Sequence, residues 1–192
     1  RETLLSTDRE NLNFIDHLIN TCDNAKKMIA QPVNYRIEPS GIPMDDNKEN
    51  FNPVISDDGK TFVYMTKLPF YNAVMCSINR NDVWSEPENI TPYLKPEGQI
   101  FVSSLSGDGK KLFFSKNDLF NSDIFISVLN GKTWSEPVKL NKNINTKYWE
   151  SQAYITDDGK SIVFSSDRPG GFGGLDIYIS YKEKDDWGPA AN

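Results

Sequence analysis

The chain has 192 residues, 38% hydrophobic and 25% charged, which supplies enough apolar material for a buried core and excludes wholesale disorder. Its formal net charge of −6 and its pI near 4.9 argue against nucleic-acid binding, because phosphate contacts need clustered lysine and arginine. No apolar run approaches the roughly 20 residues of a membrane-spanning helix, so we expect no transmembrane segment in this chain.

The first predicted element is an amphipathic helix over residues 10–30. Apolar residues recur there at helical spacing, from Leu12 and Ile15 to Met28 and Ile29, and Pro32 blocks continuation of the helix. One such helix cannot bury its own apolar stripe, so it either packs on the remainder of the chain or ends an upstream helical-repeat region. We therefore treat residues 1–33 as a helical segment that is separate from residues 34–192.

The remainder of the chain repeats with a period of 50 residues, extended to 53 in the last unit by a glycine-rich insert. Three landmarks recur in one order: an Asp-Gly-Lys turn, an aspartate before the third strand, and a tryptophan that begins the last strand. Their positions are Asp58, Gly59, Asp108, Gly109, Asp158 and Gly159; Asp123 and Asp176; and Trp84, Trp134 and Trp187. Such regular recurrence indicates a repeat architecture, in which we assign structural roles to these residues.

Each unit reads as four short strands. In the second unit we expect strands over 101–105, 111–115, 123–128 and 134–140, joined by the Asp-Gly and Asn-Gly pairs that suit tight hairpins. Repeated four-stranded units of about 40–50 residues are typical of β-propeller blades. The predicted fold class is therefore mainly β: a partial propeller with three blades, about 45–94, 95–144 and 145–192, preceded by one amphipathic helix.

We expect these three blades to belong to a larger ring and the chain to be a piece of a larger protein. Propellers have typically 4–8 blades, so three cannot close a circle. Residues 35–44 also fit the outer-strand position of a preceding unit, since Met44 aligns with Leu94 and Ile144 at intervals of 50 residues.

Two stretches resemble the repeat of TolB-like, WD40-type propellers: Pro53–Tyr64 (PVISDDGKTFVY) and Ser165–Tyr178 (SSDRPGGFGGLDIY). The second is similar to the repeat in OmpA-family, peptidoglycan-associated outer-membrane proteins, including a propeller protein of the type IX secretion apparatus. The likeness departs in the first two blades, where Lys67-Leu68 and Lys116-Asn117-Asp118 replace the Ser-Asp-Arg signature.

The resemblance implies a periplasmic, outer-membrane-associated scaffold. Its partners would be proteins of an envelope complex, and it would reach peptidoglycan only through a domain that this chain does not contain. It implies neither a cofactor nor a catalytic role.

The residues themselves offer little catalytic chemistry. His17 is the only histidine and lies in the predicted helix, no nucleophile-elbow motif is present, and the oxygen-rich spacing of a calcium loop is absent. The aspartates of the repeated turns are explained as turn formers. We expect no catalytic or metal site, and Cys22 and Cys76 to be free buried thiols, with a single disulfide as the alternative.

The candidate partner-binding residues are those that do not repeat between blades. They are Tyr148, Trp149, Glu150, Gln152, Arg168 and Phe172, with Phe70 and Tyr71 as further candidates. Two other classes stay open: a propeller that binds carbohydrate or wall fragments through Trp149, and a hydrolase fragment whose paired carboxylates lie on separate blades.

Overall fold

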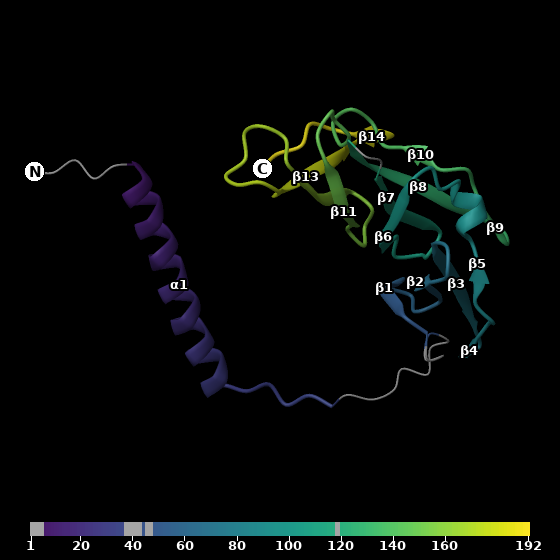
Figure 1. The fold of residues 1–192 in the computed structure, drawn as a ribbon. Helices are drawn as coiled ribbons and strands as arrows, with labels where there is room; N and C mark the ends of the chain where they lie inside the picture. The colour runs from purple at the N-terminus through teal and green to yellow at the C-terminus, as the bar shows by residue number, and fades with distance from the viewer. Residues whose placement is uncertain (1–5, 37–43, 45–47, 118–119) are drawn as a thin grey trace, which may run out of the picture. The chain divides into compact units, whose positions relative to one another are not determined.

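The computed structural model describes residues 6–36, 44, 48–117 and 120–192. The chain divides into two compact units, Arg1–Ser40 and Gly41–Asn192. The first unit contains α1 (Ser6–Ala30), which begins four residues before the predicted start (Figure 1). Along its described side chains, the apolar stripe that includes Leu12, Ile15 and Ile19 is exposed. No helix in the described part of the chain is long and apolar enough to cross a membrane.

The second unit consists of three consecutive antiparallel sheets, each with three long strands; the outer strand is short, and in the first two sheets it is broken into two pieces (Figure 1). The first sheet holds β1 (Asn50–Ile55), β2 (Thr61–Lys67), β3 (Asn72–Arg80), β4 (Val83–Trp84) and β5 (Glu88–Asn89). The short helix η1 (Thr91–Leu94) leads to β6 (Gln99–Leu105), β7 (Lys111–Asn117), β8 (Ser122–Asn130), β9 (Thr133–Trp134) and β10 (Val138–Lys139). The third sheet holds β11 (Glu150–Ile155), β12 (Ser161–Ser166), β13 (Asp176–Glu183) and β14 (Asp186–Trp187). This arrangement confirms the prediction of a mainly β, partial propeller.

The outer strand is interrupted, whereas the sequence predicted one strand over 134–140. In the second blade, β9 and β10 are separated by Ser135-Glu136-Pro137. The serine replaces ladder bonds: Val128 N–H donates to Ser135 Oγ at 3.0 Å, and Ser127 Oγ donates to the Ser135 carbonyl at 2.7 Å. Because proline has no N–H to donate, the regular ladder cannot continue through this point.

The same pair of hydrogen bonds holds each of the three Asp-Gly-Lys turns, which explains why this sequence recurs. Ser56 Oγ donates to Asp58 Oδ1 at 2.6 Å, and Lys60 N–H donates to the same oxygen at 3.0 Å. Both bonds recur at Asp108 and Asp158. They lower the pKa of each carboxyl; the hydroxyl donor is the largest cause in the first two turns and the backbone donor in the third.

Two clusters of buried side chains hold the blades together. Residues of the first blade such as Val74 and Cys76 pack with Leu112, Phe114 and Trp134 of the second. The same contacts recur one blade later, with these members: Phe113 and Ile124 of the second blade, and Ile162, Phe164 and Trp187 of the third. The core of the second unit therefore lies between its sheets, which is the packing of propeller blades.

The outward face of the first blade differs from the outward face of the third blade. In the first blade Trp84 is half-buried and meets Phe62 edge to face, with 6.0 Å between ring centroids. In the third blade Ile177 is exposed, although the aligned Ile124 of the second blade is buried between sheets. Residues 37–43, which hold most of the predicted preceding strand, lie outside the described residues.

Candidate functional site

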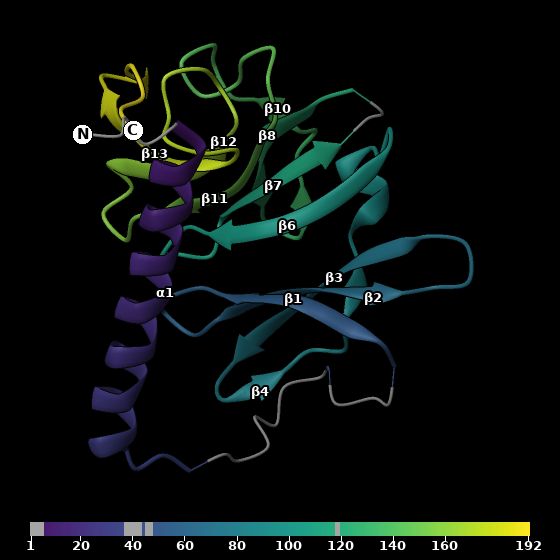
Figure 2. The ribbon, with the colours of Figure 1, turned by 60° about the vertical axis from the view of Figure 1, so that its left-hand side comes forward.

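The candidate site lies at one edge of the second unit, where the second strand of each blade ends and the third begins. We call this the loop edge. The arrows of β2 and β7 point to the same side in Figure 2, and the first strand of each blade starts there, since Asn50 pairs with Thr66 and Glu150 with Ser166. The loop edge therefore gathers the β2–β3, β7–β8 and β12–β13 loops and the segments that lead into β6 and β11.

Each of these loops carries a phenylalanine that is almost wholly exposed. Phe70, Phe120 and Phe172 have 97%, 91% and 96% of their surface exposed. Phe70 and Phe172 were candidates from the sequence, whereas Phe120 was missed. Its signal was present: Phe120 lies 50 residues after Phe70, in the same position of the next repeat.

The glycine-rich loop that carries Phe172 is fixed by Asp176. Gly173 N–H donates to Asp176 Oδ2 at 3.0 Å, and a Cβ added to Gly171 would lie only 2.0 Å from that oxygen. Gly170 has a φ of +102°, which other residues rarely adopt. The glycines thus let the loop fold around the carboxylate, and the phenylalanine projects from its surface.

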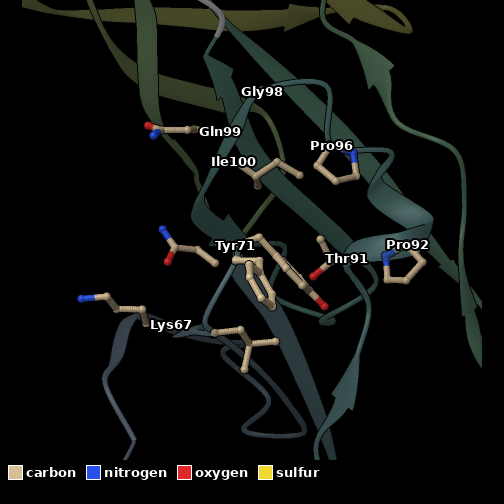
Figure 3. Close-up of a pocket in the computed structure, with 11 residues that line it drawn as sticks. Lys67, Tyr71, Thr91, Pro92, Pro96, Gly98, Gln99 and Ile100 are labelled. Carbon is tan, nitrogen blue, oxygen red and sulfur yellow. The ribbon is translucent and has the colours of Figure 1, made fainter.

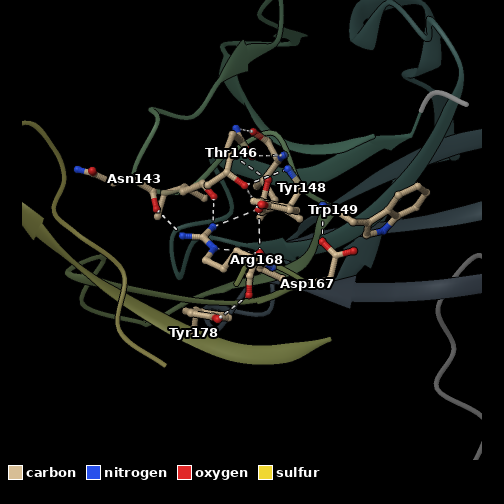
Figure 4. A network of polar contacts seen from close by, with 12 residues as sticks. Asn143, Thr146, Tyr148, Trp149, Asp167, Arg168 and Tyr178 are labelled. Atoms are coloured by element: carbon tan, nitrogen blue, oxygen red, sulfur yellow. Dashed lines mark hydrogen bonds and ion pairs between the residues drawn. The ribbon is translucent and has the colours of Figure 1, made fainter. Parts of the chain in front are cut away.

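Arg168 lies in a polar network (Figure 4), in which its guanidinium pairs with the buried carboxylate of Glu150. Arg168 Nη1 donates to the Asn143 carbonyl at 3.0 Å and Nη2 to the Ile144 carbonyl, both in the segment that arrives from the second blade. Nε donates to Ser166 Oγ at 2.9 Å, and Nη2 lies 3.3 Å from Glu150 Oε1. The guanidinium thereby joins the third blade to the second.

The Glu150 carboxylate is fully buried and saturated with donors. Thr146 N–H and Thr146 Oγ1 donate to its two oxygens at 2.8 and 2.6 Å, and Ser166 Oγ donates at 2.8 Å. Burying a charged group is tolerated when it is paired and hydrogen-bonded, as it is here. Glu150 is 0% exposed, so its carboxylate is engaged within the chain.

The guanidinium of Arg168 also lies between two aromatic rings. Its central carbon is 5.0 Å from the Phe164 ring centroid and 4.9 Å from that of Tyr178, a cation–π geometry. Lys116 holds a comparable place one blade earlier: its Nζ lies 4.8 Å from the Phe125 ring and donates to the Lys95 carbonyl at 2.9 Å. Burial lowers the pKa of this ammonium. Each of these cations therefore anchors the segment that links its blade to the preceding one.

Trp149 and Gln152 lie on the inner side of the blades. Trp149 N–H donates to Asp167 Oδ1 at 2.7 Å, which fixes the backbone that carries the half-buried indole. Both residues line a groove of about 630 Å³ between the innermost strands β1, β6 and β11, together with the aromatic side chains of Phe51 and Tyr154. Tyr148 is half-buried and donates its N–H to Thr146 Oγ1 at 3.1 Å.

A second cavity opens at the loop edge between the first and second blades (Figure 3). Its volume is about 660 Å³, within the usual range of ligand pockets. The lining is supplied by the β2–β3 loop, by η1 and by the start of β6, and includes Phe70, Tyr71, Pro92, Pro96 and Ile100. Tyr71 was a sequence candidate; the prolines were not, because exposed prolines alone predict only turns.

The remaining chemically reactive side chains to consider are carboxylates and thiols. At the opposite edge, partial desolvation and then the neighbouring Asp157 raise the pKa of Asp57. Among the residues that the structure describes, no group of three or more His, Cys, Asp and Glu side chains has a metal-binding arrangement. Both cysteines are free; Cys76 is buried as expected, whereas Cys22 is exposed, because α1 does not bury its apolar face within the first unit.

No protein-family model matches the chain, and no curated protein sequence matches it significantly. Among solved structures, TolB from Acinetobacter baumannii is 19% identical, with 73% of this chain and 31% of that chain covered and a TM-score of 0.47. A putative TolB from Agrobacterium tumefaciens is 18% identical, with 77% and 50% covered and a TM-score of 0.53. The chain thus spans half or less of the length of these proteins. The second likeness supports the β-propeller fold.

Proposed function

We propose that this chain is a non-catalytic scaffold that docks protein partners at its loop edge. The observation that carries the proposal is the set of three nearly fully exposed phenylalanines, Phe70, Phe120 and Phe172, at the tips of three equivalent loops. Exposed aromatic side chains on one edge suit a docking surface, because interfaces are enriched in aromatic anchors.

The energetic scale supports a docking role. Burying one phenylalanine contributes roughly 1.5–3 kcal/mol, so three anchors on one edge provide a substantial part of a protein–protein affinity before association costs are subtracted. Hydrogen bonds and glycines hold the Phe172 loop in place, which reduces the entropy lost when a partner binds. Trp149 offers a further aromatic surface from the adjoining groove.

The proposed setting is the periplasm, in association with the outer membrane. It rests on the resemblance of Ser165–Tyr178 to the repeats of OmpA-family propeller proteins, and the TolB-like fold is compatible with it. On the same basis we propose a link to type IX secretion, and to peptidoglycan through another domain. We also propose that the helical segment ends at residue 33, and that the blades are divided near residues 94/95 and 144/145.

One observation favours a second candidate function, the binding of carbohydrate or wall fragments. The groove between the inner strands combines the aromatic Trp149 and Tyr154 with the amide of Gln152, a combination that suits a sugar ring. The groove offers the exposed amides of Asn52 and Gln152 beside backbone-paired strands, whereas the loop edge carries three protruding aromatic anchors. We therefore place protein docking first.

Site-specific photocrosslinking in the producing cells tests the proposal. A photoreactive phenylalanine analogue replaces Phe70, Phe172 or Trp149 in turn, and Lys110 or Lys160 at the Asp-Gly turns of the opposite edge serve as matched exposed controls. We expect one reproducible set of protein adducts at the loop-edge positions and none at the controls. Equal adducts at both edges, or retention of wall sugar without any protein adduct, would refute protein docking.

A further inference from the structure

The cavity between the first and second blades is the open form of a junction that is sealed one blade later. At the later junction Ser122 forms a parallel bridge with Trp149, and Ser122 Oγ donates to the Glu150 carbonyl at 2.7 Å. The residues aligned with Ser122 and Trp149, 50 positions earlier, are Asn72 and Gln99. Within the described ranges, no bridge or side-chain hydrogen bond joins these two residues, and both line the cavity.

The two junctions also differ in the residue that precedes Gln99 in one and Trp149 in the other. The residue aligned with Tyr148 is Gly98, which contributes no side chain and has a φ of +98°. Tyr148 is half-buried, with the Lys147 ammonium 5.3 Å from its ring centroid. The first junction therefore lacks an aromatic ring that the second junction possesses.

The walls of the cavity suit such a ring. Phe70 and Tyr71 supply aromatic faces, and Pro92, Pro96 and Ile100 supply aliphatic surface. Tyr71 is held in place by the amide of Asn89, whose Nδ2 donates to the Tyr71 hydroxyl at 3.1 Å. The opening is bordered by polar groups, including the Lys67 ammonium, which is paired with Glu49 at 2.8 Å.

We propose that this cavity takes an aromatic side chain from a peptide segment of the protein partner. The inserted ring would occupy the space beside Gly98, where the second junction carries Tyr148, and the exposed amides of Asn72 and Gln99 would hydrogen-bond the peptide backbone beside it. The inference rests on the proposed function and specifies the chemistry of the partner: an extended segment with one exposed Trp, Tyr or Phe.

The test titrates the isotopically labelled chain with N-acetyl-tryptophanamide and N-acetyl-phenylalaninamide and follows amide chemical shifts by NMR. We expect saturable shifts at Gly98, Gln99 and Ile100. Tyr71→Ala should weaken binding by about tenfold or more, because it removes an aromatic wall. Tyr71→Phe keeps the ring and should bind within about twofold of the parent. Tyr181→Ala, which removes a comparably exposed tyrosine from β13 of the third blade, is the matched control and should leave binding unchanged.

Tyr71 is half exposed and outside both buried clusters, so the variants should keep the parent's unfolding temperature, which is measured alongside. Absence of shifts with both aromatic amides would overturn the inference, as would equal shifts with N-acetyl-valinamide or with N-acetylglucosamine. If crosslinks at Phe172 and Trp149 persist while the probes fail, only the cavity assignment falls. If the probes bind but no protein adduct forms, the scaffold proposal falls instead.

Discussion

Replacing Arg168 with methionine distinguishes a structural arginine from a docking one. The substitution keeps the aliphatic stem but removes the guanidinium, and with it the bonds to Asn143, Ile144 and Ser166 and the ion pair with Glu150. The Arg168 side chain is 13% exposed and that of Glu150 0%, so the carboxylate would stay buried without its countercharge.

The expected cost follows from that burial. Removing one partner of a buried ion pair costs about 3–5 kcal/mol. Glu150 keeps its hydrogen bonds from Thr146 and Ser166, which places the cost near the lower end, at about 3 kcal/mol. For a domain of this size that loss lowers the unfolding temperature by roughly 6–12 °C.

Thermal and urea unfolding followed by circular dichroism measure the effect. Lys67→Met is the matched control, because it removes a cation from an exposed pair and should cost at most about 1 kcal/mol. Adding Glu150→Gln to Arg168→Met should restore part of the lost stability, since no buried charge is left unpaired. If Arg168→Met and Lys67→Met unfold alike, the network does not stabilise the blade junction and our reasoning is wrong.

Three further outcomes follow from the structure. Asp57→Asn should raise the unfolding temperature at pH 7, because the raised pKa of this carboxyl means that folding disfavours its charged form; the gain should vanish as the pH falls below the ordinary value of 3.8, and a pH-independent gain would contradict this cause. A thiol reagent at pH 8 should modify Cys22 at once but Cys76 only during unfolding, because burial raises the pKa of Cys76 to about 12; two fast thiols in an absorbance assay would disprove the burial of Cys76. Gly109→Ala should destabilise clearly more than Gly59→Ala in urea titrations: φ is +66° and +67°, but the new Cβ would lie 2.3 Å from a threonine hydroxyl only at Gly109.

Sequence reasoning recovered the blades because their local chemistry repeats. The Asp-Gly turns and the alternating apolar strands are specified by neighbours a few residues away, so a 50-residue period exposes them directly. The interruption at Ser135 was not predicted, although Pro137 was visible. Its physical basis is the Ser135 hydroxyl, which accepts the Val128 N–H in place of a backbone carbonyl, and this contact can be predicted only when the neighbouring strand is known.

The candidate site was harder to predict, because a residue can differ from its counterparts in other blades for two reasons. It can bind a partner, or it can make a structural contact that only its own blade needs. Glu150 and Arg168 differ from their counterparts in other blades, as a binding residue would, yet the structure places both inside a junction. The sequence does not distinguish a structural contact that occurs in one blade from a functional contact, since in both cases the residue differs from the repeat. Phe120 shows the opposite error. It was not considered as a binding residue because its position repeats that of Phe70, yet Phe70, Phe120 and Phe172 are all exposed.

The interrupted outer strands also determine how this protein avoids unwanted partners. A continuous strand on the rim of each blade would present a row of unpaired N–H and C=O groups, and such a row invites another chain to add a strand. Here the rim is divided into two-residue pieces around Pro87 and Pro137, which cannot serve as a template for a neighbouring strand. Associations by edge-to-edge sheet growth are thereby disfavoured along the rim of the first two blades, and selective recognition is left to the side chains of the loops.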